Sequence, residues 1–100
     1  MTAIFFIDTD NIIFLEVFQK DLTIYTEEDE ITSRISLGEA MERLDSSRFI
    51  QVSKSASVNI SKIRRMEVAF SGNYYAFLAN DMKVTVSRRF VRCLKQKLGI

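Results

Sequence analysis

The sequence of 100 residues contains no histidine, no proline and a single cysteine. Histidine is the commonest general base and zinc ligand in proteins, so its absence argues against both roles. One cysteine, Cys93, excludes an internal disulfide, and a Cys/His metal site cannot be built within one chain. The sequence also lacks a nucleophile motif and a glycine-rich phosphate loop. We therefore expect neither enzymatic activity nor a cofactor or a bound metal.

Long hydrophobic runs are also missing. The N-terminal apolar segment, residues 3–7, has no basic region ahead of it, and Asp8 and Asp10 interrupt it, so we predict neither a signal peptide nor a membrane-spanning helix. A cytoplasmic location fits this composition best. With 47% hydrophobic side chains, 100 residues suffice for one core and are too few for two independent cores. Residues 1–100 are therefore expected to form a single domain.

The net charge of +1 hides an uneven distribution along the chain. Residues 1–50 carry four bases and eleven acids, a net charge of −7, whereas residues 51–100 carry ten bases and two acids, a net charge of +8. If the basic half gathers its cations on one side of a small domain, the field there favours a polyanion such as nucleic acid. The alternative is that the acidic and basic halves simply attract each other.

The first half of the chain is expected to form short strands followed by one helix. Runs rich in β-branched and aromatic residues predict strands over residues 3–7, 12–18, 22–26 and 30–35. The acidic turn at residues 27–29 is interpreted as a solvated tip. Ser36 and Glu39 have the spacing of a capping box and apolar residues follow at helical intervals, which predicts a short amphipathic helix over residues 36–44. This helix should cover one face of the sheet.

The second half is expected to form a three-strand meander that ends in a helix. The strands are predicted over residues 63–70, 74–78 and 82–86. Left-handed backbone angles are expected in the turns, at Gly72–Asn73 or at Asn80–Asp81. Ser87 is predicted to be the N-cap of a C-terminal helix that ends at Gly99. The order of elements predicts a mostly β fold with small helices.

A serine-rich loop stands between the two halves. Residues 49–63 begin and end with apolar side chains, while the middle offers Ser53, Ser55 and Ser57 around one cation, Lys54. If buried residues hold both ends of this segment, it can present Lys54 rigidly. The simpler interpretation is a serine-rich connection between strands.

Two segments of the sequence resemble the LytTR family of DNA-binding domains. The first matches at Phe49, Val52, Lys54, Ser55, Val58, Asn59 and Ile63. The second runs from Val84 to Phe90 and is followed by a further matching residue, Leu94. The resemblance implies an elongated stack of small antiparallel sheets, with loops that enter successive major grooves of DNA. Composition and periodicity alone do not predict that arrangement.

The resemblance implies base-reading contacts at Lys54, at Arg88 and, in the early turn, at Lys20. Arg88 can offer a two-pronged contact to guanine, whereas Lys54 can make only point contacts. Many family members have histidine in place of Ser53 and an aromatic residue in place of Ala56, so the preferred bases are expected to differ. Phosphate-facing support is expected from Ser53, Ser55, Ser57 and Arg89.

Structural interpretations stand beside these roles. Lys54 is alternatively a solvated loop lysine, and Arg88 alternatively pairs with an acid from the first half of the chain, such as Glu39 or Glu42. Asn59 is predicted to be a turn or hydrogen-bonding residue rather than a DNA contact.

By resemblance, the chain is expected to be a sequence-specific, double-stranded DNA-binding transcriptional regulator of bacterial type. Family members usually follow a phosphoacceptor receiver domain and bind paired direct repeats, one domain per repeat, which allows a homodimer on DNA. Here the chain is expected to be either an excised output domain of a longer response regulator or a stand-alone regulator controlled by a partner, often a membrane protein. The alternative function is a protein-interaction module that docks a partner through its acidic half, without specific DNA binding.

Overall fold

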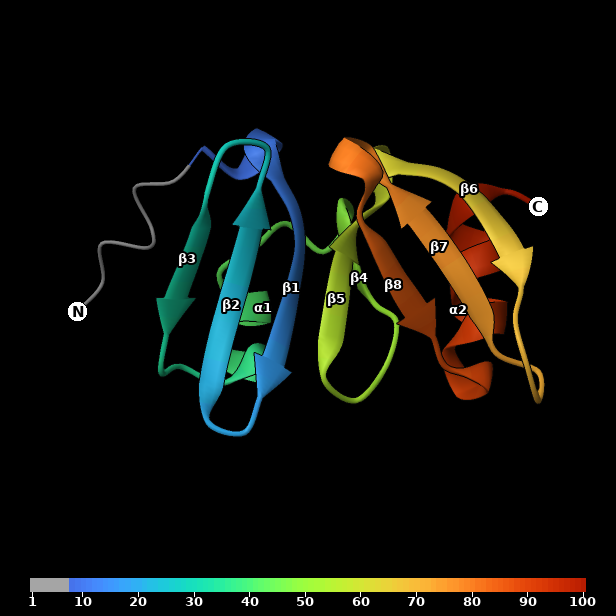
Figure 1. Ribbon diagram of the computed structural model, residues 1–100, viewed down its shortest axis with the longest axis horizontal. Coiled ribbons are helices and arrows are strands. Elements are labelled where there is room, and N and C mark those ends of the chain that lie inside the picture. The colour runs from blue at the N-terminus through green and yellow to red at the C-terminus, as the bar shows by residue number, and fades with distance from the viewer. Residues whose placement is uncertain (1–7) are drawn as a thin grey trace.

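The computed structural model describes residues 8–100, which form two antiparallel sheets and two α-helices (Figure 1). The first sheet has the strand order β3-β2-β1-β5-β4 and the second has the order β6-β7-β8. Their bounds are β1 Ile12–Phe18, β2 Asp21–Thr26, β3 Glu30–Ser33, β4 Phe49–Gln51, β5 Ala56–Asn59, β6 Ile63–Val68, β7 Tyr74–Leu78 and β8 Lys83–Val86. The helices are α1, Leu37–Glu42, and α2, Arg88–Leu98, and the short 3-10 turns are η2, Thr9–Asn11, η3, Ile60–Lys62, and η4, Ala79–Asp81.

The mostly β fold that the sequence predicts is confirmed. The predicted strand at residues 3–7 lies outside the described residues. The described part of the chain is elongated, with principal extents of 38 × 24 × 23 Å, and the two sheets follow one another along the long axis (Figure 1). No helix within residues 8–100 is long and apolar enough to cross a membrane.

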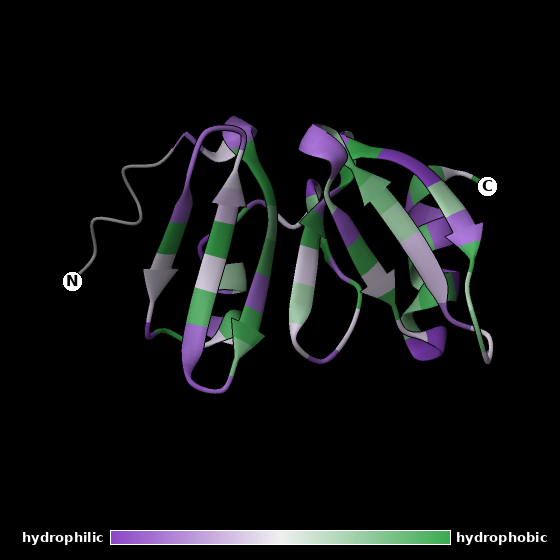
Figure 2. Ribbon diagram, in the orientation of Figure 1, coloured by the Kyte–Doolittle hydropathy of each residue, from purple (hydrophilic) through white to green (hydrophobic). Residues whose placement is uncertain are grey.

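Two apolar clusters hold these elements together. One lies between the first sheet and α1, where Leu15 and Leu22 pack with Leu37. The other joins the opposite face of the first sheet to the second sheet and α2, and its members include Val58 and the fully buried Leu94. Along β2 the residues alternate in hydropathy and in burial (Figure 2), because successive side chains point to opposite faces of a sheet. The sheets are therefore fixed to each other through shared apolar contacts.

Helix α1 begins as the sequence predicts. The Ser36 side-chain oxygen accepts a hydrogen bond from the Glu39 backbone N–H at 3.0 Å. This bond satisfies one of the N–H groups that have no partner inside the helix. The helix is shorter than expected and ends at Glu42 rather than near residue 44.

Helix α2 begins after the predicted N-cap residue, Ser87, but without the side-chain hydrogen bond that such a cap commonly makes. Asn73, from the β6–β7 turn, supplies the acceptor instead. At the other end, Gly99 adopts the left-handed conformation with a φ of 78°, as expected for a helix C-terminus.

Left-handed backbone angles occur at Gly72, Asn80 and Asp81, as the sequence predicts. The prediction for Asn73 is wrong, because the neighbouring Ser71 takes the positive φ in that turn. Asn73 keeps an ordinary backbone conformation, which leaves its side chain directed toward α2. Gln19, in the β1–β2 turn, is a further residue with positive φ.

Tyr25 in β2 should make the stability of the fold decrease at alkaline pH. Its ring stacks on Phe14 with centroids 4.4 Å apart, and burial, followed by the charges of Glu16 and Glu30, raises the pKa of Tyr25. Because the pKa of Tyr25 is higher in the folded protein than in the unfolded chain, its contribution to stability is complete below the ordinary tyrosine pKa of about 10. This contribution is lost as the pH rises from there through the raised folded-state pKa. In urea unfolding from about pH 8 to 11, Tyr25→Phe should lose less stability than the wild type. Identical profiles for the two proteins would contradict this.

Candidate nucleic-acid interface

Three connections between elements lie along one long edge of the molecule, at the bottom of Figure 1. They are the β1–β2 turn at residues 19–20, the β4–β5 loop at residues 52–55 and the start of α2 at residues 87–89. They carry the sequence-predicted cations Lys20, Lys54 and Arg88, all of which are exposed. We call these three segments the cationic edge. The fold thus places the three predicted base-reading residues on the same edge of the molecule.

Backbone hydrogen bonds connect the three segments to one another. Val17, near the end of β1, donates its N–H to the Ser55 carbonyl at 2.8 Å. Ser87, just before α2, donates its N–H to the Val52 carbonyl at 2.9 Å. The β4–β5 loop is therefore bonded on one side to the first hairpin and on the other to the start of α2.

The β4–β5 loop has the organisation expected of a segment that presents one cation. Val52 is fully buried, and the Ser53 side-chain oxygen accepts a hydrogen bond from the Ser55 N–H at 3.2 Å. Gln51 adds a bond from its side-chain amide to the Ser53 carbonyl at 2.8 Å. Lys54 stands exposed between the two serines. Both serines thus support the loop that carries Lys54.

Arg88 is the first residue of α2, and its side chain is exposed. Its backbone N–H donates to the Asn73 side-chain oxygen at 2.9 Å, and its aliphatic stem lies beside Gly72. Within residues 8–100, the Arg88 guanidinium forms no ion pair, so the alternative pairing with Glu39 or Glu42 is not present. Arg89, the next residue, is also exposed.

Ser57 does not belong to this surface, so its expected phosphate-facing role is wrong. Its side chain is fully buried in β5, and its hydroxyl donates to the Met41 sulfur at 3.0 Å. The reason is that β5 is a central strand, paired with β1 on one side and β4 on the other, and all four of its residues are buried.

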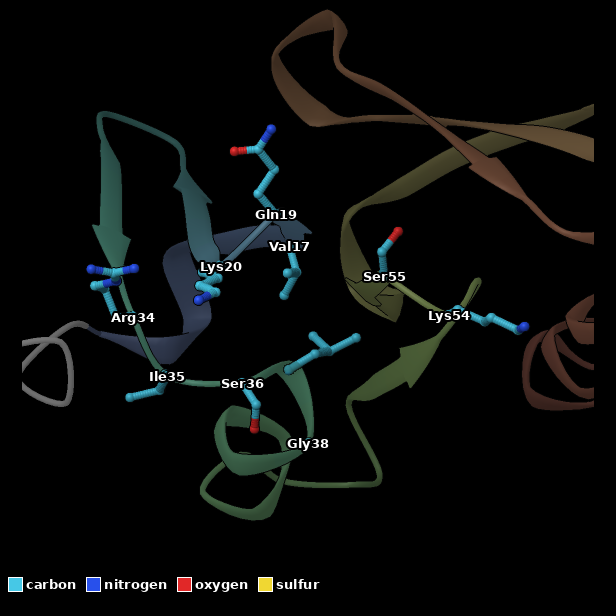
Figure 3. A pocket seen from close by; sticks show the side chains of 10 residues that line it. Val17, Gln19, Lys20, Arg34, Ile35, Ser36, Gly38, Lys54 and Ser55 are labelled. Carbon is cyan, nitrogen blue, oxygen red and sulfur yellow. The ribbon is translucent and has the colours of Figure 1, made fainter.

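A cleft of about 530 Å³ separates the β1–β2 turn from the β4–β5 loop (Figure 3). Its polar and charged lining includes Lys20, Arg34, Ser36, Lys54 and Ser55, and no acid lines it among the residues described. Figure 3 shows the Lys54 side chain extending away from Lys20 and Arg34. The Arg34 Nε lies 3.8 Å from an Asp21 carboxylate oxygen, and both side chains are more than half exposed. Sequence patterns gave no reason to single out Arg34.

The opposite long edge carries acids. The β2–β3 turn, η2 and η4 lie along the top of Figure 1, and this acidic edge contains Asp10, Glu27, Glu28, Asp29 and Asp81. Lys62 pairs with Glu27 there, and Arg48 pairs with Asp10. Among the ion pairs within residues 8–100, one joins the acidic half of the sequence to the basic half, Lys62–Glu27. The others lie within one half: Arg48–Asp10, Arg34–Asp21 and Arg65–Glu67. Mutual attraction of the halves therefore does not account for the cations of the cationic edge.

Comparison with known proteins gives a match over nearly the whole chain. A family model described as the LytTr DNA-binding domain matches residues 2–99. The sensory transduction protein LytT of Enterococcus faecalis is 27% identical over 97 residues, which cover 97% of this chain and 40% of that protein. The transcriptional regulatory protein YpdB of Escherichia coli K12 is 30% identical over 92 residues, which cover 91% of this chain and 38% of that protein.

A solved structure confirms the fold. It is the LytTr DNA-binding domain of a protein described as a methyl-accepting/DNA response regulator from Bacillus cereus, with a TM-score of 0.86. The match covers 94% of this chain and 86% of that one, at 23% sequence identity. The chain spans about 40% of the length of the curated relatives it matches.

Proposed function

Because the chain belongs to the LytTr DNA-binding domain family, we propose that it is the part of a bacterial transcriptional regulator that recognises double-stranded DNA. The observation that carries this proposal is the cationic edge. Lys20, Lys54 and Arg88 stand exposed on it, and within residues 8–100 none of them is held in an ion pair with an acid. Phosphates and base edges require such unpaired donors.

The dimensions of the domain suit a duplex that lies along this edge. The long axis measures 38 Å, and one helical turn of DNA measures about 34 Å. In this proposal Lys20 enters one major groove, and Lys54 and Arg88 enter the next. The hydrogen bond from the Ser87 N–H to the Val52 carbonyl, which joins the segments that carry Lys54 and Arg88, supports this pairing. The cleft between them faces the phosphate ridge that separates the grooves. Ser53, Ser55 and Arg89 flank these contacts.

We further propose that two copies bind paired direct repeats, as the resemblance to the family implies. Repeats separated by whole helical turns place both domains on one side of the duplex, so a homodimer can form on DNA. Since relatives extend well beyond the matched segment, a receiver domain in a longer chain is one source of control. A separate regulatory protein, such as one in the membrane, is the other.

A selection of bound duplexes from a random pool tests the proposal. We expect an enriched sequence that occurs as a direct repeat, bound far more tightly than random DNA, with affinity that falls steeply as salt rises. If no sequence is enriched and affinity for all duplexes is equal, the alternative of a protein-interaction module that uses the acidic edge is favoured.

Replacing Arg34 with alanine tests the role of the cleft. If Arg34 contacts a phosphate, the variant should bind specific and random duplexes more weakly by the same factor, and the slope of log affinity against log salt should fall by about one. The slope is measured by titration at several salt concentrations.

Arg65→Ala is the matched control for Arg34→Ala. Arg65 is also an exposed arginine paired with an acid, Glu67, but it lies in β6, away from the cleft. Both variants lose one positive charge, so a difference between them reports a local contact. Equal salt slopes for the two variants would exclude Arg34 as a phosphate contact.

A further inference from the structure

The first N–H group of α2 is satisfied from outside the helix. The opening N–H groups of a helix have no partner within it, and a residue at the N-cap position commonly supplies one through its side chain. Ser87 makes no such bond. Instead, Asn73, fifteen residues earlier in the chain, accepts the Arg88 N–H on its side-chain oxygen at 2.9 Å. The residue that begins α2 is thus tied to the β6–β7 turn.

The Asn73 side chain projects from a turn that is itself closed by hydrogen bonds. Its backbone N–H donates to the Phe70 carbonyl, and its carbonyl accepts the Ala69 N–H, both at 2.9 Å. Asn73 is half-buried, whereas Ser71 and Gly72 before it are exposed. The acceptor that holds Arg88 is therefore carried by a fixed frame.

Gly72 provides a second contact to the same arginine. An added Cβ at this position would lie 2.6 Å from the Arg88 Cδ and 3.1 Å from its Cγ, which is too close for either atom to remain in place. The φ of +84° at Gly72 also favours glycine. The aliphatic part of the Arg88 side chain therefore lies against the β6–β7 turn. It occupies the space that a side chain at position 72 would need.

From these contacts we infer that Asn73 and Gly72 are positioning residues for Arg88, and that they determine how sharply it discriminates between bases. The inference rests on the proposed function, in which Arg88 reads a base edge. Asn73 fixes the position of the Arg88 backbone through the hydrogen bond to its N–H. Gly72, which has no side chain, leaves room for the aliphatic part of the Arg88 side chain. A bidentate arginine needs both its position and its direction to match guanine. Without the contacts from Asn73 and Gly72, DNA binding must also order a flexible Arg88 side chain, which costs free energy.

The structural half of this inference is testable without DNA. In Asn73→Ala, amide hydrogen exchange at Arg88 should become faster because its acceptor is lost. Asn73→Asp keeps an oxygen at the same place and should retain the protection. If exchange at Arg88 is the same in the wild type and in Asn73→Ala, Asn73 does not hold the start of α2.

The functional half is tested by the ratio of affinities for the selected duplex and for random duplex. Asn73→Ala should lower this ratio by about 2- to 12-fold, the cost of ordering one long side chain. Gly72→Ala should lower it as well, through displacement of the Arg88 stem. In an Arg88→Ala background, Asn73→Ala should have no further effect on the ratio, because the side chain it positions is gone.

Asn80→Ala is the matched control for a lost turn asparagine. The Asn80 side chain also makes a long-range bond, from its Nδ2 to the Glu27 carbonyl at 2.8 Å, but it lies on the opposite edge of the domain. This variant should lose stability and keep the wild-type ratio. If Arg88→Ala lowers the ratio and Asn73→Ala does not, the positioning role is excluded and the proposed function stands. If Arg88→Ala leaves the ratio unchanged, the reading role of Arg88 and its positioning fail together.

Discussion

Replacing Arg88 with alanine is expected to weaken binding to the selected duplex by about 1 to 3 kcal/mol, and to relax the preference at one base position. The reason is that Arg88 is exposed on the cationic edge and that its guanidinium has no acidic partner within residues 8–100. A guanidinium can donate two parallel hydrogen bonds to one guanine, and this contact is lost on the wrong base. Competition titrations with duplexes substituted one base pair at a time measure the effect.

Two further variants separate base reading from charge. Arg88→Lys keeps the positive charge but lacks the forked donors, so it should retain binding to random duplex and lose discrimination. Arg92→Ala removes an exposed cation one turn further along α2 and should weaken binding to every duplex by the same small factor. If Arg88→Ala lowers affinity for specific and random duplex equally, Arg88 is a phosphate contact and does not read a base.

Replacing Asn59 with alanine is expected to lower the free energy of unfolding by about 2 to 4 kcal/mol. Asn59 is fully buried at the end of β5. Its Nδ2 donates to the Ile12 carbonyl at 2.8 Å, and its Oδ1 accepts from the Ser61 N–H at 3.1 Å and from the Ser61 hydroxyl at 2.9 Å. Alanine would leave the buried Ile12 carbonyl without this partner and remove the cap of η3.

Urea unfolding of Asn59→Ala and of a surface control gives the comparison. Asn11→Ala changes an exposed asparagine in η2 and should alter stability by less than about 0.5 kcal/mol. A loss for Asn59→Ala no larger than that of the control would show that the buried network contributes little. Because Asn59 lies in the interior, its folded variant should keep the same base preference as the wild type.

The parts of the fold that depend on nearby residues could be predicted from the sequence. Ser36 caps α1 through the residue three positions later, and alternation along β2 buries Leu22 and Ile24. Asn59 was also predicted to be a hydrogen-bonding residue, and the structure confirms this. In each case the signal is a spacing of a few residues, which local geometry converts directly into contacts.

The parts that depend on distant segments could not be predicted in this way. Ser57 looks like a loop serine, and its burial follows from pairing with β1, more than forty residues earlier. The bond from Asn73 to Arg88 requires the β6–β7 turn to meet the start of α2, which no local spacing reveals. The positions of Lys54 and Arg88 were suggested by the family resemblance, and their placement on one edge comes from the way the two sheets stack.

The acidic edge opposite the cationic edge gives the domain a permanent electric dipole moment perpendicular to its long axis. The field of a duplex exerts a torque on this moment, which turns the lysines and arginines toward the phosphates before any contact forms. When the acidic edge faces the duplex, the phosphates repel it, so a larger share of encounters has the cationic edge toward the DNA. We therefore expect neutralisation of Glu27, Glu28 and Asp29 to slow capture of DNA and to allow unproductive poses, even though none of the three touches the bases.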